Sequence, residues 1–241
     1  MTSNKKTARL AGFFYFIVVL SGIFSLMYVP STLFVRGDVS ATIQNIKASE
    51  FLYRSGMVSA MICYVFFLLL PLVLYKLLQP VNDTYAKLMV ALAVVSVPIS
   101  LLNIQNRFAI LTLINDANYL TVFGAEQLQA QVLFYLRLFN DGNLIAQIFW
   151  ALWLFPLGFL IFKSGFLPKF LGIILMVGSA GYVLDFFGWT LLPNYQELPI
   201  ADFATLPASI GEIGTCLWLL IAGAKEKEKS DVQPQSTVEV A

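Results

Sequence analysis

Six stretches of 19 to 23 residues that carry at most one charge each dominate this sequence. A helix of about 20 apolar residues crosses the roughly 30 Å hydrocarbon core of a bilayer, and a helix satisfies its own backbone hydrogen bonds where lipid offers none. The sequence therefore predicts an all-α fold, a polytopic membrane bundle of six transmembrane helices. The predicted spans are Leu10–Val29, Ser55–Tyr75, Leu88–Asn106, Gly142–Phe162, Phe170–Leu192 and Phe203–Ala224.

The composition excludes several classes of function. Charged residues make up 12% of the 241 residues, about half of the ~25% usual in soluble domains, so they could not cover a core that is 59% apolar. The net charge of +1 leaves no basic surface for a nucleic acid. There is no His, and the two Cys lie in apolar runs, so neither a metal site nor a cofactor site is expected. The lipid bilayer is the expected partner, and any protein partner is unknown.

The distribution of Lys and Arg predicts the orientation. If the N-terminus lies in the cytoplasm, ten basic residues fall on the inner side and five on the outer side, as the positive-inside rule requires. The sequence thus favours an N-in, C-in topology in the cell (cytoplasmic) membrane. The five outer residues are Arg36, Lys47, Arg54, Arg107 and Arg137.

One membrane domain, residues 1–224, accounts for nearly the whole chain. Residues 225–241 are polar, with alternating Lys and Glu, and are expected to form a disordered cytoplasmic tail. In the first outer loop, Asp38 is placed to cap a short helix. In the second, residues 127–139 have an apolar face and are expected to lead directly into the fourth span.

The motifs at the ends of several spans resemble a known family. The turn before the fifth span reads GFLIFKSGFLPKFLG from Gly158 to Gly172, and the end of the second span reads LYKLLQPVN from Leu74 to Asn82. The first outer loop contributes GDVSAT from Gly37 to Thr42. Together these segments are similar to the uncharacterised bacterial integral-membrane family catalogued as domain of unknown function 4386. The resemblance implies a bacterial multi-span protein and supplies no catalytic or binding residues.

Polar side chains inside the spans are the candidate site. In the third span Ser96, Ser100, Asn103 and Arg107 recur at helical spacing and share one face, and polar residues recur similarly in the next three spans. A charge in mid-membrane costs about 2.5–3.5 kcal/mol even on the lenient insertion scale, so such residues need partners. The candidate cluster, placed in the outer half of the bundle, is Arg54, Asn103, Arg107, Arg137, Asp141, Asp185 and Glu212.

Two interpretations of this cluster remain open. It could be an ion-pair network that fixes packing, or a polar pocket that binds or carries a small amphipathic or anionic ligand. Both interpretations predict that Asp185 and Glu212 face the interior and contact Arg54, Arg107, Arg137 or Asn side chains. A non-enzymatic binding or carrier function is favoured over a structural or regulatory partner protein. An intramembrane enzyme is less favoured, because no recognisable motif holds a nucleophile.

Overall fold

The computed structural model describes residues 3–225, which are almost entirely helical and contain no β-strand. Six helical segments within this range are long and apolar enough to cross a membrane, which confirms the predicted fold class and number of spans. The helices are α1 (Ser3–Gly22), π-helix η1 (Ile23–Tyr28), α2 (Val29–Leu33), α3 (Val39–Ala48), α4 (Glu50–Leu78), α5 (Asp83–Asn103), α6 (Gln105–Asn115), α7 (Ala117–Val122), α8 (Ala125–Ser164), α9 (Lys169–Leu191), 3-10 helix η2 (Tyr195–Glu197), α10 (Pro199–Phe203) and α11 (Leu206–Ile221).

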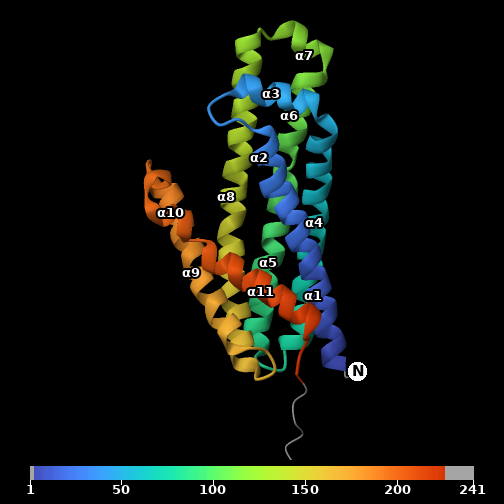
Figure 1. Ribbon diagram of the computed structural model, residues 1–241, viewed down its shortest axis with the longest axis vertical. Coiled ribbons are helices and arrows are strands. Elements are labelled where there is room, and N and C mark those ends of the chain that lie inside the picture. The colour runs from blue at the N-terminus through green and yellow to red at the C-terminus, as the bar shows by residue number, and fades with distance from the viewer. Residues whose placement is uncertain (1–2, 226–241) are drawn as a thin grey trace, which may run out of the picture.

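The long helices form a closed ring in chain order. Each of α1, α4, α5, α8 and α9 packs on the next, and α11 packs on both α9 and α1 (Figure 1). Glycine allows two of these contacts to be close. A Cβ on Gly12 would clash with the backbone of Leu220, and one on Gly158 would lie 2.6 Å from the carbonyl oxygen of Gly172. Both ends of the described chain lie at the same end of the ring (Figure 1). The side of the membrane on which they lie remains a prediction.

Two spans are interrupted, which the sequence did not indicate. The first span widens into η1, where the π-helical turn is broader than an α-helical turn. The third span breaks between α5 and α6, where the N–H of Ile104 bonds to the carbonyl of Leu101 at 3.2 Å in a tighter turn. The break places Arg107 in the first turn of α6.

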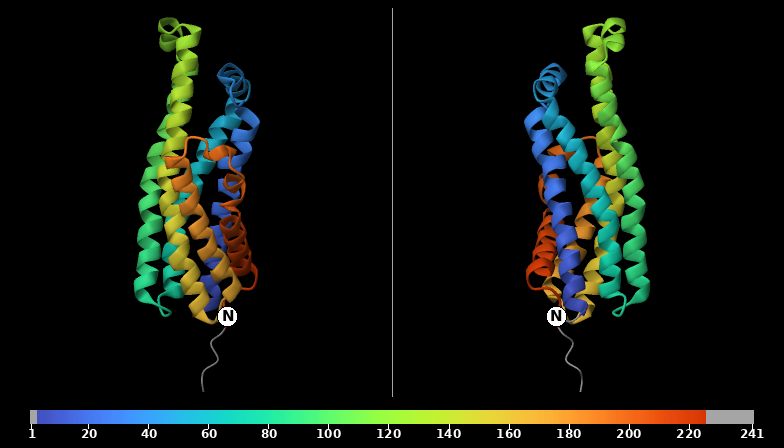
Figure 2. Two further views of the ribbon diagram at one scale, coloured as in Figure 1. Left: turned by 90° about the vertical axis from the view of Figure 1, so that its left-hand side faces the viewer. Right: turned by 90° about the vertical axis from the view of Figure 1, so that its right-hand side faces the viewer.

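The fourth span is much longer than the bilayer requires. Residues 127–139 continue into it without a break, as predicted, and α8 has 40 residues. At 1.5 Å per residue it is about 60 Å long, twice the hydrocarbon thickness. The start of α8 therefore projects with α7 beyond α3 at the end away from the termini (Figure 2).

The predicted cap at Asp38 is present. The Asp38 carboxylate accepts the N–H of Ala41 at 2.8 Å at the start of α3. Gly165 adopts a positive φ of 72° where α8 ends, and Pro168 precedes α9. The predicted tail lies outside the described residues, apart from Lys225.

Candidate functional site

Arg107 is the most unusual polar residue in the structure. Its side chain is only 4% exposed although arginine is almost never fully buried without a partner. The guanidinium carbon lies 4.2 Å from the ring centre of Phe139 on α8, 5.2 Å from that of Phe34 and 5.8 Å from that of Tyr53 on α4. These three rings form the aromatic cage of Arg107, because each of them presents the electron-rich face that attracts a cation.

Local structure holds each wall of the cage. The Tyr53 hydroxyl donates to the backbone carbonyl of Arg107 at 3.2 Å, which ties α4 to α6. Phe34 follows the last residue of α2 in an extended conformation, and its ring centre lies 6.3 Å from that of Tyr53. Phe139 is buried on α8, which runs beside both α5 and α6.

The guanidinium of Arg107 has no counter-charge among the described residues. The structure gives its side chain no hydrogen bond, and Nη1 is fully buried without a partner. Cation–π contacts are worth about 0.5–2 kcal/mol each, whereas a buried charge without a carboxylate or hydrogen bonds costs several kcal/mol. The predicted ion-pair network around Arg107 is therefore wrong, and what the structure shows instead is a buried cation that lacks an anion.

An amide network lies one turn before Arg107. Asn103 Nδ2 donates to the carbonyl of Phe139 at 2.8 Å and to Oδ1 of Asn143 at 3.0 Å, and its own oxygen accepts from Asn106 at 2.9 Å. Gly142 makes room for it, because a Cβ there would clash with the Asn103 amide. The network fixes α5 and α8 in register just below the cage.

Three other predicted residues are exposed and do not join Arg107. Arg54 pairs with Glu50 one turn earlier on α4, at 2.6 Å, and its side chain is 53% exposed. Arg137 and Asp141 are exposed on α8. The prediction that these side chains gather in one cluster with Arg107 is not supported, since the rotation of α4 and α8 turns them outward.

The two intramembrane acids have neutral partners. Asp185 on α9 is 6% exposed and accepts a hydrogen bond from Gln147 of α8 at 2.7 Å. Glu212 on α11 is half-buried and accepts from the hydroxyl of Tyr15 on α1 at 3.0 Å. Both acids therefore find polar partners on neighbouring helices, but neither forms an ion pair with a described basic residue. The partners are Gln and Tyr, where the sequence suggested Arg or Asn.

The aromatic residues that surround Arg107 were not predicted from the sequence. Phe34, Tyr53 and Phe139 are three among 21 Phe and 10 Tyr, so residue type alone could not distinguish them. A usable signal was the spacing of Phe139 and Asn143, which share one face of α8 and contact Arg107 and Asn103 respectively.

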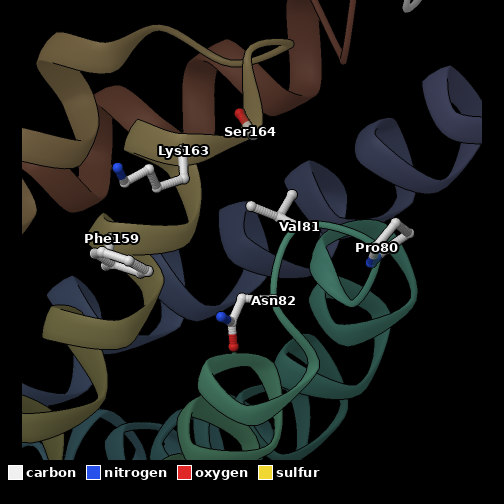
Figure 3. Close-up of a pocket in the computed structure, with 6 residues that line it drawn as sticks. All are labelled: Pro80, Val81, Asn82, Phe159, Lys163 and Ser164. Carbon is white, nitrogen blue, oxygen red and sulfur yellow. The ribbon is translucent and has the colours of Figure 1, made fainter.

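Two surface hollows lie away from the cage. One, of about 360 Å³, lies at the end of the bundle that holds the termini (Figure 3). It is formed by the turn between α4 and α5 and by the end of α8, so it joins two of the segments on which the resemblance to the family rests. The other, of about 290 Å³, lies at the end of α9 and includes Trp189 and Tyr195. No group of three potential metal ligands occurs in the described part of the chain.

Comparisons with known proteins give a family but no activity. A family model described as a domain of unknown function (DUF4386) matches residues 10–223. An uncharacterised protein of Archaeoglobus fulgidus is 34% identical over 74 residues, which is 29% of this chain and 39% of that protein. The chain thus covers well under half the length of that relative. No solved structure matches the chain.

Proposed function

We propose that this chain, which belongs to the family described as a domain of unknown function (DUF4386), is a non-enzymatic membrane protein that binds the anionic head of a small amphipathic ligand at Arg107. The observation that carries the proposal is the buried guanidinium with no counter-charge and an unpartnered Nη1 among the described residues. A carboxylate or phosphate bound there would supply the missing acceptor.

The surroundings of Arg107 suit an amphipathic anion. The three aromatic rings offer apolar contacts to a chain, and the amides of the Asn103 network lie one helical turn away and could bond to a polar head. The site lies in the half of the bundle away from the termini, which is the outer half if the predicted N-in orientation in the cytoplasmic membrane holds.

A structural role is the second candidate, and one observation favours it. The cage joins three separate segments of the chain, since Phe34, Tyr53 and Phe139 all contact the same guanidinium. In that case Arg107 would hold these segments together and no ligand would be needed.

Thermal unfolding of the purified protein in an uncharged detergent distinguishes the two functions. At 100 times its dissociation constant, a bound ligand such as dodecyl phosphate should raise the melting temperature by about 5–10 °C. Dodecanol, which has the same chain without the charge, should have little effect. The replacement Arg107→Gln should abolish the response to dodecyl phosphate, whereas Arg137→Gln, at an exposed position on α8, should retain it.

An equal response of Arg107→Gln and wild type would contradict the proposal. If Arg107→Gln does not fold, Arg107→Lys is the second variant. It keeps the positive charge but loses the planar guanidinium with its paired N–H donors, so it should bind dodecyl phosphate more weakly than wild type. A wild-type protein that gains no stability from dodecyl phosphate or from dodecanoate would leave the structural role as the better explanation.

A further inference from the structure

The second hollow lies where α9 reaches the membrane surface. The 23 residues of α9 span about 34 Å, close to the thickness of the hydrocarbon core, so we expect its last turn at the interface. The hollow has a volume of about 290 Å³. Its lining residues are Trp189, Thr190, Leu191, Leu192, Pro193, Tyr195 and Gln196.

Two aromatic rings form one side of this hollow. Tyr195 folds back onto α9 and packs on Gly188, where a Cβ would clash with its ring. The ring centres of Trp189 and Tyr195 are 6.3 Å apart, at 61° to each other. The Tyr195 hydroxyl is buried and has no hydrogen-bond partner of good geometry in the described residues. Both residues thus line the hollow at a fixed angle to each other, with Trp189 45% exposed and Tyr195 only 4% exposed.

Negative charge lies behind the rings. Asp185 comes one helical turn before Trp189, is 6% exposed and forms no ion pair with a described basic residue. Burial raises the pKa of Tyr195, and the nearby Asp185 carboxylate raises it further, so the phenol stays neutral beside the carboxylate. Pro193 has no N–H to offer the carbonyl of Trp189 four residues earlier, which leaves a free oxygen at the negative end of α9.

This combination suits an organic ammonium group better than a metal ion. No carboxylate is among the described residues that line the hollow, whereas a hard metal ion needs several oxygen ligands in direct contact. Aromatic faces beside a carboxylate bind alkylammonium groups through cation–π and charge attraction. Trp189 has the larger ring and is the more exposed of the two, so it should contribute more to the binding of the ammonium group than Tyr195 does.

A positively charged side chain contacts one of the residues that line the same hollow. Arg36, in the turn between α2 and α3, donates from Nη2 to Oε1 of Gln196, and Gln196 lines the hollow. Arg36 is exposed, so its remaining donors are open to a ligand. Arginine binds phosphate well because its planar fork matches the phosphate oxygens.

We propose that this hollow binds a zwitterionic phosphate–ammonium group, with the ammonium against Trp189 and Tyr195 near Asp185 and the phosphate on Arg36. Such a group occurs both in phospholipid headgroups and in free phosphorylated amino alcohols. The site is separate from Arg107 and does not depend on the function proposed there.

The test uses the full chain and two probes. Free phosphocholine is titrated against the protein in an uncharged detergent, and stability is compared in nanodiscs of phosphatidylcholine and of phosphatidylglycerol, which lacks the ammonium. Binding in either form should be about tenfold weaker in Trp189→Leu and in Asp185→Asn. Asp141→Asn, an exposed acid on α8, is the matched control and should bind as wild type does.

The two probes distinguish the sources of the group. A response to phosphocholine in detergent indicates a free ligand, and stabilisation only by phosphatidylcholine nanodiscs indicates a lipid. Equal stability in both nanodiscs together with no response to phosphocholine would overturn the proposal, as would wild-type binding by Trp189→Leu. Trp189 is 45% exposed, so its replacement should fold even if Asp185→Asn does not. Arg107→Gln should keep this binding, so that failure at one site is not mistaken for failure at the other.

Discussion

Arg107 and Arg54 lie towards the same end of the bundle, yet the two arginines have opposite surroundings. Arg54 is exposed and pairs with Glu50 within one turn of its own helix. Arg107 is buried, has no acid beside it in the described structure, and is held by three rings from three segments. The ion pair of Arg54 requires only that Glu50 lie four residues earlier on the same helix. The cage of Arg107 forms only when separate segments of the chain pack together. The difference indicates that Arg54 contributes to local helix stability and that Arg107 has a role that justifies its burial.

The largest effect should come from removing a wall of the cage. Phe139→Ala deletes a buried ring and should lower the free energy of unfolding by about 3–5 kcal/mol. Phe51→Ala is the matched control, since Phe51 is 86% exposed and should lose little. Melting temperatures in detergent measure the stability of both variants. Similar losses of stability in Phe139→Ala and Phe51→Ala would show that the packing of Phe139 in the cage contributes little.

The amide network below the cage should matter less. Asn103→Ala removes the bonds to Asn143 and to the carbonyl of Phe139, and should cost about 2 kcal/mol because buried partners are left unsatisfied. Asn140→Ala, at an exposed position on α8, should stay within about 0.5 kcal/mol of wild type. Chemical unfolding in mixed micelles would reveal the contrast, and no difference between the two variants would contradict it.

Removing the cation of Arg107 should not destabilise the ligand-free protein. Arg107→Met keeps an apolar side chain of similar length among the rings and relieves an uncompensated charge, so stability should rise by about 1 kcal/mol. The measurement is the melting temperature of the variant beside that of wild type, both without added amphiphile. A loss of more than about 2 kcal/mol would mean that the cation–π contacts outweigh burial, and would support the structural role.

The smallest effect should be at the exposed pair. Arg54→Gln breaks an i, i+4 ion pair and should cost less than about 0.5 kcal/mol. The loss should shrink further in high salt, because exposed charges are screened. Melting curves at low and high salt test this, and a large salt-independent loss would show that Arg54 is not the solvated residue described above.

The sequence predicted most of the fold and only part of the site. Long apolar runs determine spans locally, so the six helices, the cap at Asp38 and the continuous start of α8 were predictable. The partners of a polar residue depend on how each helix is rotated about its axis. Asp185 was correctly expected to be buried, but its partner Gln147 could not be chosen from among the polar residues of four spans. The ion-pair prediction for Arg107 failed because it assumed that a buried guanidinium needs a carboxylate partner. In the structure, aromatic rings surround this cation.

The widened turn η1 has a consequence for the cage. It stands six residues before Phe34, and a π-helical turn accommodates about one residue more than an α-helical turn does. If η1 tightened to α-helical geometry, the surplus residue would shift along the span and α2 would turn by about 100° relative to α1. Phe34 would then swing off the guanidinium while Tyr53 and Phe139 stayed in place. The π-helical turn therefore sets the rotation of α2 at which Phe34 meets the guanidinium of Arg107.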